Sequence, residues 1–143
     1  MCLGVFLACD AELPVIPWSS ASPAFNVSVL EDREAGVRNQ FSKRHIYYLG
    51  SHTKCSCGFS PQEEPDEADR RPSVRALVSY LDAATAKGAV EMFVCWSGDE
   101  ATPPKQRLEL RVAQLAEQDD WLGELTFVRL LPNQRLQRAG SAG

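Results

Sequence analysis

The stretch Ser73–Gly98, "SVRALVSYLDAATAKGAVEMFVCWSG", decides the fold because it joins the clearest helix of the chain directly to its clearest strand. Pro72 or Ser73 suits a first helical turn, Lys87 a last turn and Gly88 the stop after it. Apolar residues recur at the spacing of one helix face, at Val74, Leu77, Val78, Leu81 and Ala84. We therefore predict a helix over about 73–87 with one apolar face.

The run from Val90 to Trp96 follows this helix without a linker and is apolar almost throughout. A short continuous apolar run of this length is typical of a strand buried on both faces. The apolar face of the helix needs a surface to cover, and a sheet that contains this strand provides one.

Further strands are predicted from alternating or continuous apolar patterns on both sides of this unit. They cover residues 3–9, 25–31, 44–49, 107–112 and 123–131. The segment 107–116 also fits a helix face, so helix and strand stay open there. The succession of strands around a single helix indicates an α+β fold. We predict a single domain with a mixed or antiparallel sheet of about five strands and the helix packed on one face.

The length and the charge of the chain indicate how many domains it has and which partners and locations to expect. All 143 residues suit one domain, 1–143, with an exposed acidic loop at 61–71 and a flexible C-terminal tail at 132–143. The net charge of −4 makes a nucleic-acid partner unlikely. No apolar run reaches the ~20 residues of a membrane span. No Lys or Arg precedes the short apolar run 3–9, so we expect a cytoplasmic protein rather than an exported one.

The loop Gly50–Ser60, "GSHTKCSCGFS", carries the densest set of reactive side chains. His52, Cys55 and Cys57 are candidate zinc ligands, because imidazole and thiolate are the ligands that zinc prefers. With an open fourth position, such a set would resemble a catalytic zinc site. Asp99 and Glu100, in the turn after the strand 90–96, are expected to lie behind these ligands, where Asp99 would orient His52.

Thiol chemistry is the alternative for the same loop. Cys55 and Cys57 could act as a redox pair, with Lys54 favouring the thiolate of Cys55. A second candidate nucleophile is Cys2, provided that Met1 is removed and the new amine serves as its base. The opening "MCLG" resembles the start of the N-terminal-nucleophile glutamine amidotransferases, and it departs from that family at Leu3, where the family has Gly.

Two structural interpretations stand beside these chemical ones. The loop can be a tight turn in which Gly50 and Gly58 supply positive φ angles. Cys9 and Cys95 lie inside apolar strand patterns, where a thiol packs as a small hydrophobe. A third functional class is a protein–protein interaction module that uses the acidic loop or a strand edge. The leading hypothesis is a binding or accessory protein that uses the His52/Cys55/Cys57 loop. The cofactor stays open, with zinc as the candidate ion, and so does whether the chain is an enzyme.

Overall fold

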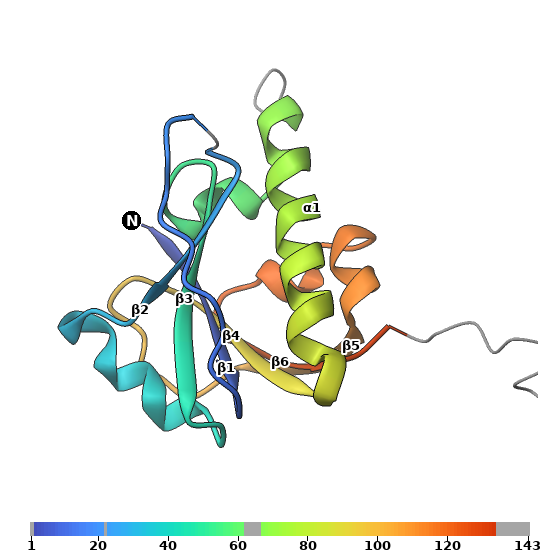
Figure 1. Ribbon diagram of the computed structural model, residues 1–143. Helices are drawn as coiled ribbons and strands as arrows, with labels where there is room; N and C mark the ends of the chain where they lie inside the picture. Colours follow the sequence, from blue (N-terminus) through green and yellow to red (C-terminus); the bar gives the residue numbers. More distant parts are fainter. Residues whose placement is uncertain (1, 22, 62–66, 134–143) are drawn as a thin grey trace, which may run out of the picture.

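The computed structural model describes residues 2–21, 23–61 and 67–133. One sheet of six strands runs through the molecule in the order β2-β3-β1-β4-β6-β5 (Figure 1). The strands are β1 Leu3–Cys9, β2 Phe25–Val29, β3 His45–Ser51, β4 Val90–Trp96, β5 Gln106–Arg111 and β6 Thr126–Leu131. The predicted α+β fold with a mixed sheet and one long helix is confirmed, with six strands in place of about five.

The direction of the strands determines which loops meet. Strand β1 is antiparallel to both of its neighbours, β3 and β4. The carboxyl ends of β3 and β4 therefore lie at the same edge of the sheet as the start of β1. Cys2, the loop after β3 and the turn after β4 come together at this edge, which is where the candidate functional residues gather.

The long helix α1, Glu67–Ala84, covers one face of the sheet and continues into a short 3₁₀ turn, η3, Thr85–Lys87. Its apolar side is buried through Val74, Leu77 and Leu81. These side chains pack against apolar residues from the centre of the sheet, among them Leu7 and Met92. The hydrophobic face predicted from the sequence is thus the one that forms the main core.

The helix begins at Glu67, earlier than the predicted start near 73, and Pro72 lies inside it. Residues 67–71 of the predicted acidic loop are therefore helical, while residues 62–66 lie outside the described residues. The first turn contains two acidic side chains, Glu67 and Asp69, which stabilise the helix by their attraction to the positive end of its dipole. Arg70 adds an ion pair with Glu67 at 3.1 Å, one helical turn apart.

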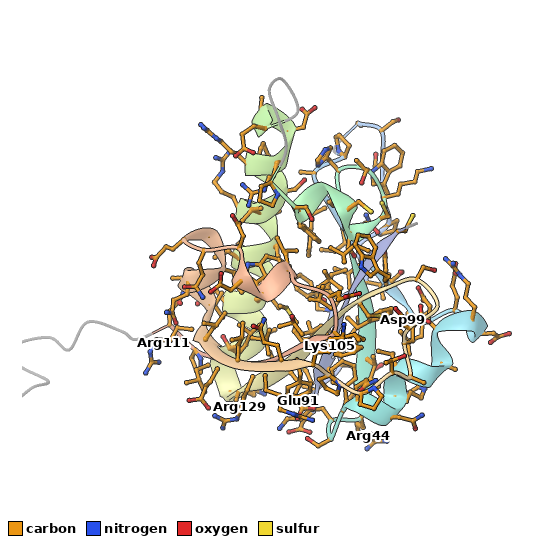
Figure 2. All side chains as sticks on the ribbon, turned by 180° about the vertical axis from the view of Figure 1, so that it is seen from behind. Arg44, Glu91, Asp99, Lys105, Arg111 and Arg129 are labelled. Atoms are coloured by element: carbon orange, nitrogen blue, oxygen red, sulfur yellow. The ribbon has the colours of Figure 1, made fainter. Side chains whose placement is uncertain are left out.

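The opposite face of the sheet carries a second, smaller core. Phe6, Ile46, Phe93 and Phe127 are buried there, and the 3₁₀ segment η1, Asp32–Gln40, contributes Val37. This segment forms one wall of the candidate site described below. Figure 2 shows the molecule from behind, with Asp99 just beyond the carboxyl end of β4 and Glu91 near the start of that strand.

The ambiguous segment 107–116 contains both predicted elements. Strand β5 ends at Arg111, and a 3₁₀ turn, η4, Val112–Ala116, follows at once. Together with η5, Asp120–Leu122, this turn forms the connection that makes β5 parallel to β6. Trp121 anchors the connection, because its ring is fully buried and its Nε1 donates hydrogen bonds to the carbonyls of Leu115 and Gln118, both at 3.1 Å.

Two other predictions concern the ends of the chain and the membrane. Residues 134–143 of the expected C-terminal tail lie outside the described residues. Among the described residues, no helix has the length and apolar character needed to cross a membrane.

Candidate functional site

Three thiols meet at the edge of the sheet where β1 starts and β3 ends. The sulfur atoms of Cys2, Cys55 and Cys57 all lie within 4.8 Å of one another. Cys2 precedes β1, whereas Cys55 and Cys57 follow β3, so the antiparallel pairing of these two strands brings them together. All five cysteines are present as thiols rather than disulfides. Among the described residues, these three are the group of metal-ligating side chains close enough to share one ion.

The loop after β3 is held against β1 by two side chains. Ser56 Oγ accepts a hydrogen bond from the N–H of Val5 at 2.8 Å and donates one to the carbonyl of Leu49 at 2.6 Å. Cys57 Sγ accepts the N–H of Leu3 at 3.2 Å. Since backbone N–H groups in a protein interior need partners, these contacts fix the loop in register with the first strand. The positions of Cys55 and Cys57 beside Cys2 follow from this attachment.

Close packing explains the glycines that flank this loop. A Cβ atom on Gly50 would collide with the carbonyl of Lys54 and with the amide of Asn26, and one on Gly58 would collide with Ser51 and His52. The prediction that these glycines supply positive φ angles is wrong. The residue in that conformation within the loop is Lys54, with φ 74°.

His52 is oriented toward the helix. The ring atom Nδ1 of His52 lies 2.8 Å from Ser73 Oγ, and the backbone N–H of His52 donates a hydrogen bond to the same oxygen at 3.1 Å. His52 is not part of the group of three convergent thiols. The three side chains that converge are therefore Cys2, Cys55 and Cys57. Cys2 takes the place in the ligand set that the sequence prediction gave to His52.

Lys54 also differs from its predicted role beside Cys55. Its ammonium lies over the ring of Trp18, 4.5 Å from the ring centroid. Trp18 in turn donates from Nε1 to the carbonyl of His52 at 3.1 Å. Both side chains thus fasten the proline-containing segment before β2 to the cysteine loop.

The pKa values of the two loop thiols are shifted in opposite directions. Burial raises the pKa of Cys55, but hydrogen bonds from Thr53, from the backbone of Cys57 and from the neighbouring thiols outweigh burial and lower it overall. Burial raises the pKa of Cys57 to about 11, and the adjacent Cys55 adds to this rise. Thr53 Oγ1 lies 3.3 Å from Cys55 Sγ. Cys55 is accordingly the thiol of the pair that loses its proton more readily.

A cavity of about 290 Å³, here called the thiol cavity, opens beside this group. Cys2 and Cys55 lie on one side of it, and Glu34, Tyr48 and Glu100 are among the residues that complete its wall. A second hollow of about 290 Å³ shares Cys55, Glu34 and Tyr48 and extends toward Lys54. Cys55 therefore lines two neighbouring hollows in the surface.

Glu34 is an unusual component of this wall, because its side chain is carboxylic and its exposed fraction is only 6%. One carboxylate oxygen, Oε1, accepts the N–H of Glu31 at 2.9 Å in a capping box that begins η1. Within the described residues Glu34 has no ion-pair partner, since the neighbouring Arg33 pairs with Glu31 at 2.7 Å. Burial raises the pKa of Glu34.

Tyr48 also lines the cavity and connects it with the cysteine loop. Its hydroxyl accepts the N–H of Ser56 at 3.0 Å. Burial raises the pKa of Tyr48 to about 12, so this side chain stays protonated at neutral pH.

The structure also places the other residues that the sequence singled out. Glu100 lines the thiol cavity, whereas Asp99 is not among its lining residues. The cysteine loop and the turn after β4 share this cavity, although β1 lies between β3 and β4. The role of Asp99 in orienting His52 stays a prediction. Cys9 and Cys95 are buried, at 3% and 0% exposure, as expected for packed thiols.

Sequence reasoning missed the joint position of Cys2 with the loop thiols and the presence of Glu34. Cys2 directly precedes a predicted strand, and an assumed antiparallel pairing of 3–9 with 44–49 would have placed it beside Cys55. Glu34 lies in a polar segment without a recognisable motif.

We compared the chain with protein-family models, with curated proteins and with solved structures, and none of the three comparisons found a match. The chemistry of the site is therefore the basis for the function proposed below.

Proposed function

We propose that this protein binds a zinc ion through the thiolates of Cys2, Cys55 and Cys57. The observation that supports this is the convergence of three thiols, from two segments distant in sequence, within 4.8 Å. Thiolates are preferred ligands of zinc, and three protein ligands with one open position form the usual arrangement of a reactive zinc site.

The spacing of the sulfur atoms suits such an ion. Three sulfurs at about 2.3 Å from one tetrahedral zinc ion stand about 3.8 Å apart. The separation of up to 4.8 Å requires inward side-chain movement of about 1 Å. Cys2 is exposed and both loop thiols are partly exposed, so an ion can reach them from solvent. Zinc binding would displace the thiol protons, and affinity would therefore rise with pH.

Elemental analysis of protein purified under reducing conditions tests this proposal. We expect about one zinc ion per chain, because the three ligands form a single site. Cys2→Ser, Cys55→Ser and Cys57→Ser should each lose most of it. Serine keeps an oxygen that can accept the N–H of Leu3 at position 57, so the loop can remain attached in that variant. Circular dichroism of each variant verifies that it folds.

Two control variants separate this ligand set from the one predicted by sequence. Cys95→Ala removes a fully buried thiol outside the group of three and should retain zinc. His52→Ala should also retain it, because His52 bonds to Ser73. Loss of zinc in His52→Ala, or its retention after replacement of Cys2, would refute the proposed set, as would wild-type protein that binds no zinc.

A second candidate function is thiol catalysis or redox chemistry by Cys55. It is favoured by the location of Cys55 on both recesses, with two further thiols close by. Alkylation of metal-free protein with iodoacetamide across pH tests it. Among the three clustered thiols, Cys55 should react first and Cys57 last, and equal rates for these two thiols would exclude a specialised role for Cys55.

The interaction module stays a prediction. Residues 62–66 of the acidic loop lie outside the described residues. In the described part of the chain, the exposed large hydrophobic side chains are Val15 at 49% and Val29 at 63%.

A further inference from the structure

The thiol cavity places a buried carboxylate beside the proposed zinc ligands. Glu34 lines the same space of about 290 Å³ as Cys2 and Cys55, although it belongs to η1, on a different part of the chain. A space of this volume holds a zinc-bound water, whose share of liquid volume is about 30 Å³, together with a small molecule. Ligand, water and carboxylate can therefore occupy one compartment.

The structure distinguishes Glu34 from the other carboxylate in the cavity. Both oxygens of Glu100 lie near the N–H of Gly98, at 3.1 and 3.2 Å, and its side chain is half-buried. Glu34 is largely buried and uses Oε1 in the capping box. No hydrogen bond is formed by its Oε2 among the described residues, and no buried side-chain oxygen there lacks a partner, so Oε2 is open to solvent. A carboxylate oxygen that is open to solvent and makes no hydrogen bond within the protein can accept a hydrogen bond or a proton from a bound water.

Glutamine would satisfy the capping box as well as glutamate does. The contact needs an acceptor oxygen at Oε1 and no negative charge. The negative charge of Glu34 lies in the first turn of η1 and is attracted by Arg33, which also lines the cavity. A proton-transfer role would use this charge. Zinc held by three cysteines, with a nearby glutamate that is not a ligand, is an arrangement that activates water in other zinc enzymes.

We propose that the thiol cavity is a hydrolytic site for small acyl compounds, in which Glu34 accepts a proton from a zinc-bound water. This inference rests on the proposed zinc site. Tyr48 and the charged side chains of Arg33 and Glu100 line the cavity beside Glu34, and its volume limits the substrate to a small molecule.

The chemical step is balanced without an external oxidant or reductant. The zinc-bound water transfers a proton to the carboxylate of Glu34, and the resulting hydroxide adds to the carbonyl carbon of an ester. The electron pair of the C=O π bond moves to the carbonyl oxygen. When the tetrahedral intermediate collapses, the bond to the leaving alkoxide breaks, and that alkoxide takes the proton back from Glu34. The products are a carboxylic acid and an alcohol.

Hydrolysis of p-nitrophenyl acetate by zinc-loaded protein tests the step. Thiols can be acylated once each, so the measured quantity is the steady release of p-nitrophenol after any initial burst. General acid–base catalysis contributes about 100-fold or more, so Glu34→Gln should lower this rate by about that factor. Removal of zinc by a chelator should abolish the steady rate.

Glu91→Gln is the matched control, because Glu91 is a half-buried carboxylate at the opposite end of β4 (Figure 2). It should keep the wild-type rate. Replacement of zinc by cobalt provides a second readout, since the visible spectrum of the Co²⁺ protein reports the thiolate ligands. Glu34→Gln should retain both the zinc content and the cobalt spectrum of the wild type.

The outcomes separate the two proposals. Zinc-loaded wild type without steady turnover, or Glu34→Gln with an unchanged rate, overturns the hydrolytic role and leaves zinc binding intact. Protein that binds no zinc overturns both, and the metal analysis reveals this before any rate is measured.

Discussion

Replacement of Ser56 by Ala tests how the cysteine loop is attached to the sheet. Ser56 is fully buried, and its Oγ serves two backbone groups, the N–H of Val5 at 2.8 Å and the carbonyl of Leu49 at 2.6 Å. Alanine removes both contacts and leaves a buried donor and a buried acceptor without partners. Each such group costs about 1–3 kcal/mol. Because the two groups lie on paired residues of β1 and β3 and can partly compensate each other, we expect a total loss of about 3 kcal/mol.

Urea unfolding of the zinc-free protein, followed by circular dichroism, measures this loss. With an m-value of about 1.5 kcal/mol/M, a loss of 3 kcal/mol lowers the midpoint by about 2 M. The control is Ser79→Ala, an exposed serine on α1, which should change stability by no more than about 0.5 kcal/mol.

The same variant connects attachment with the proposed metal site. Ser56 lies between Cys55 and Cys57, so a looser loop should also bind zinc more weakly. A loss of stability below about 1 kcal/mol for Ser56→Ala would show that its two hydrogen bonds do not hold the loop, and the reasoning would be refuted.

Three further predictions concern the core, the loop and the cavity. Trp121→Ala should destabilise the protein by about 3–5 kcal/mol in urea unfolding, because it empties the fully buried anchor of the β5–β6 connection; a loss under 1 kcal/mol would contradict this. Gly50→Ala should cost about 1–3 kcal/mol, because the new methyl group meets the carbonyl of Lys54 and the amide of Asn26; wild-type stability in thermal unfolding would argue against that contact. Burial raises the pKa of Glu34 in the folded state, so its protonation stabilises the wild type in acid, and this contribution is lost as pH rises through the folded pKa. Stability of Glu34→Gln relative to wild type should therefore increase from about pH 4 to neutral, and a difference independent of pH would disprove this linkage.

Local patterns predicted the buried face of the long helix and the central strand of this fold. The apolar spacing from Val74 to Ala84 predicts the face of α1 that is buried, and the run Val90–Trp96 predicts a central strand. Both signals arise within a few residues, since a side chain's direction repeats with the period of its own helix or strand. The early start of α1 at Glu67 was missed because acidic residues and Pro72 suggested a loop.

The composition of the candidate site depended on contacts between distant segments. Cys2 joins Cys55 and Cys57 because β1 pairs antiparallel with β3, and no local pattern specifies which strands pair. His52 belongs to the same loop as the two cysteines, yet its ring bonds to Ser73 on α1. Glu34 becomes a buried carboxylate only when η1 packs over the sheet. The residue types were therefore readable along the chain, whereas their convergence required the tertiary structure, because ligand geometry and burial depend on neighbours that sequence spacing does not identify.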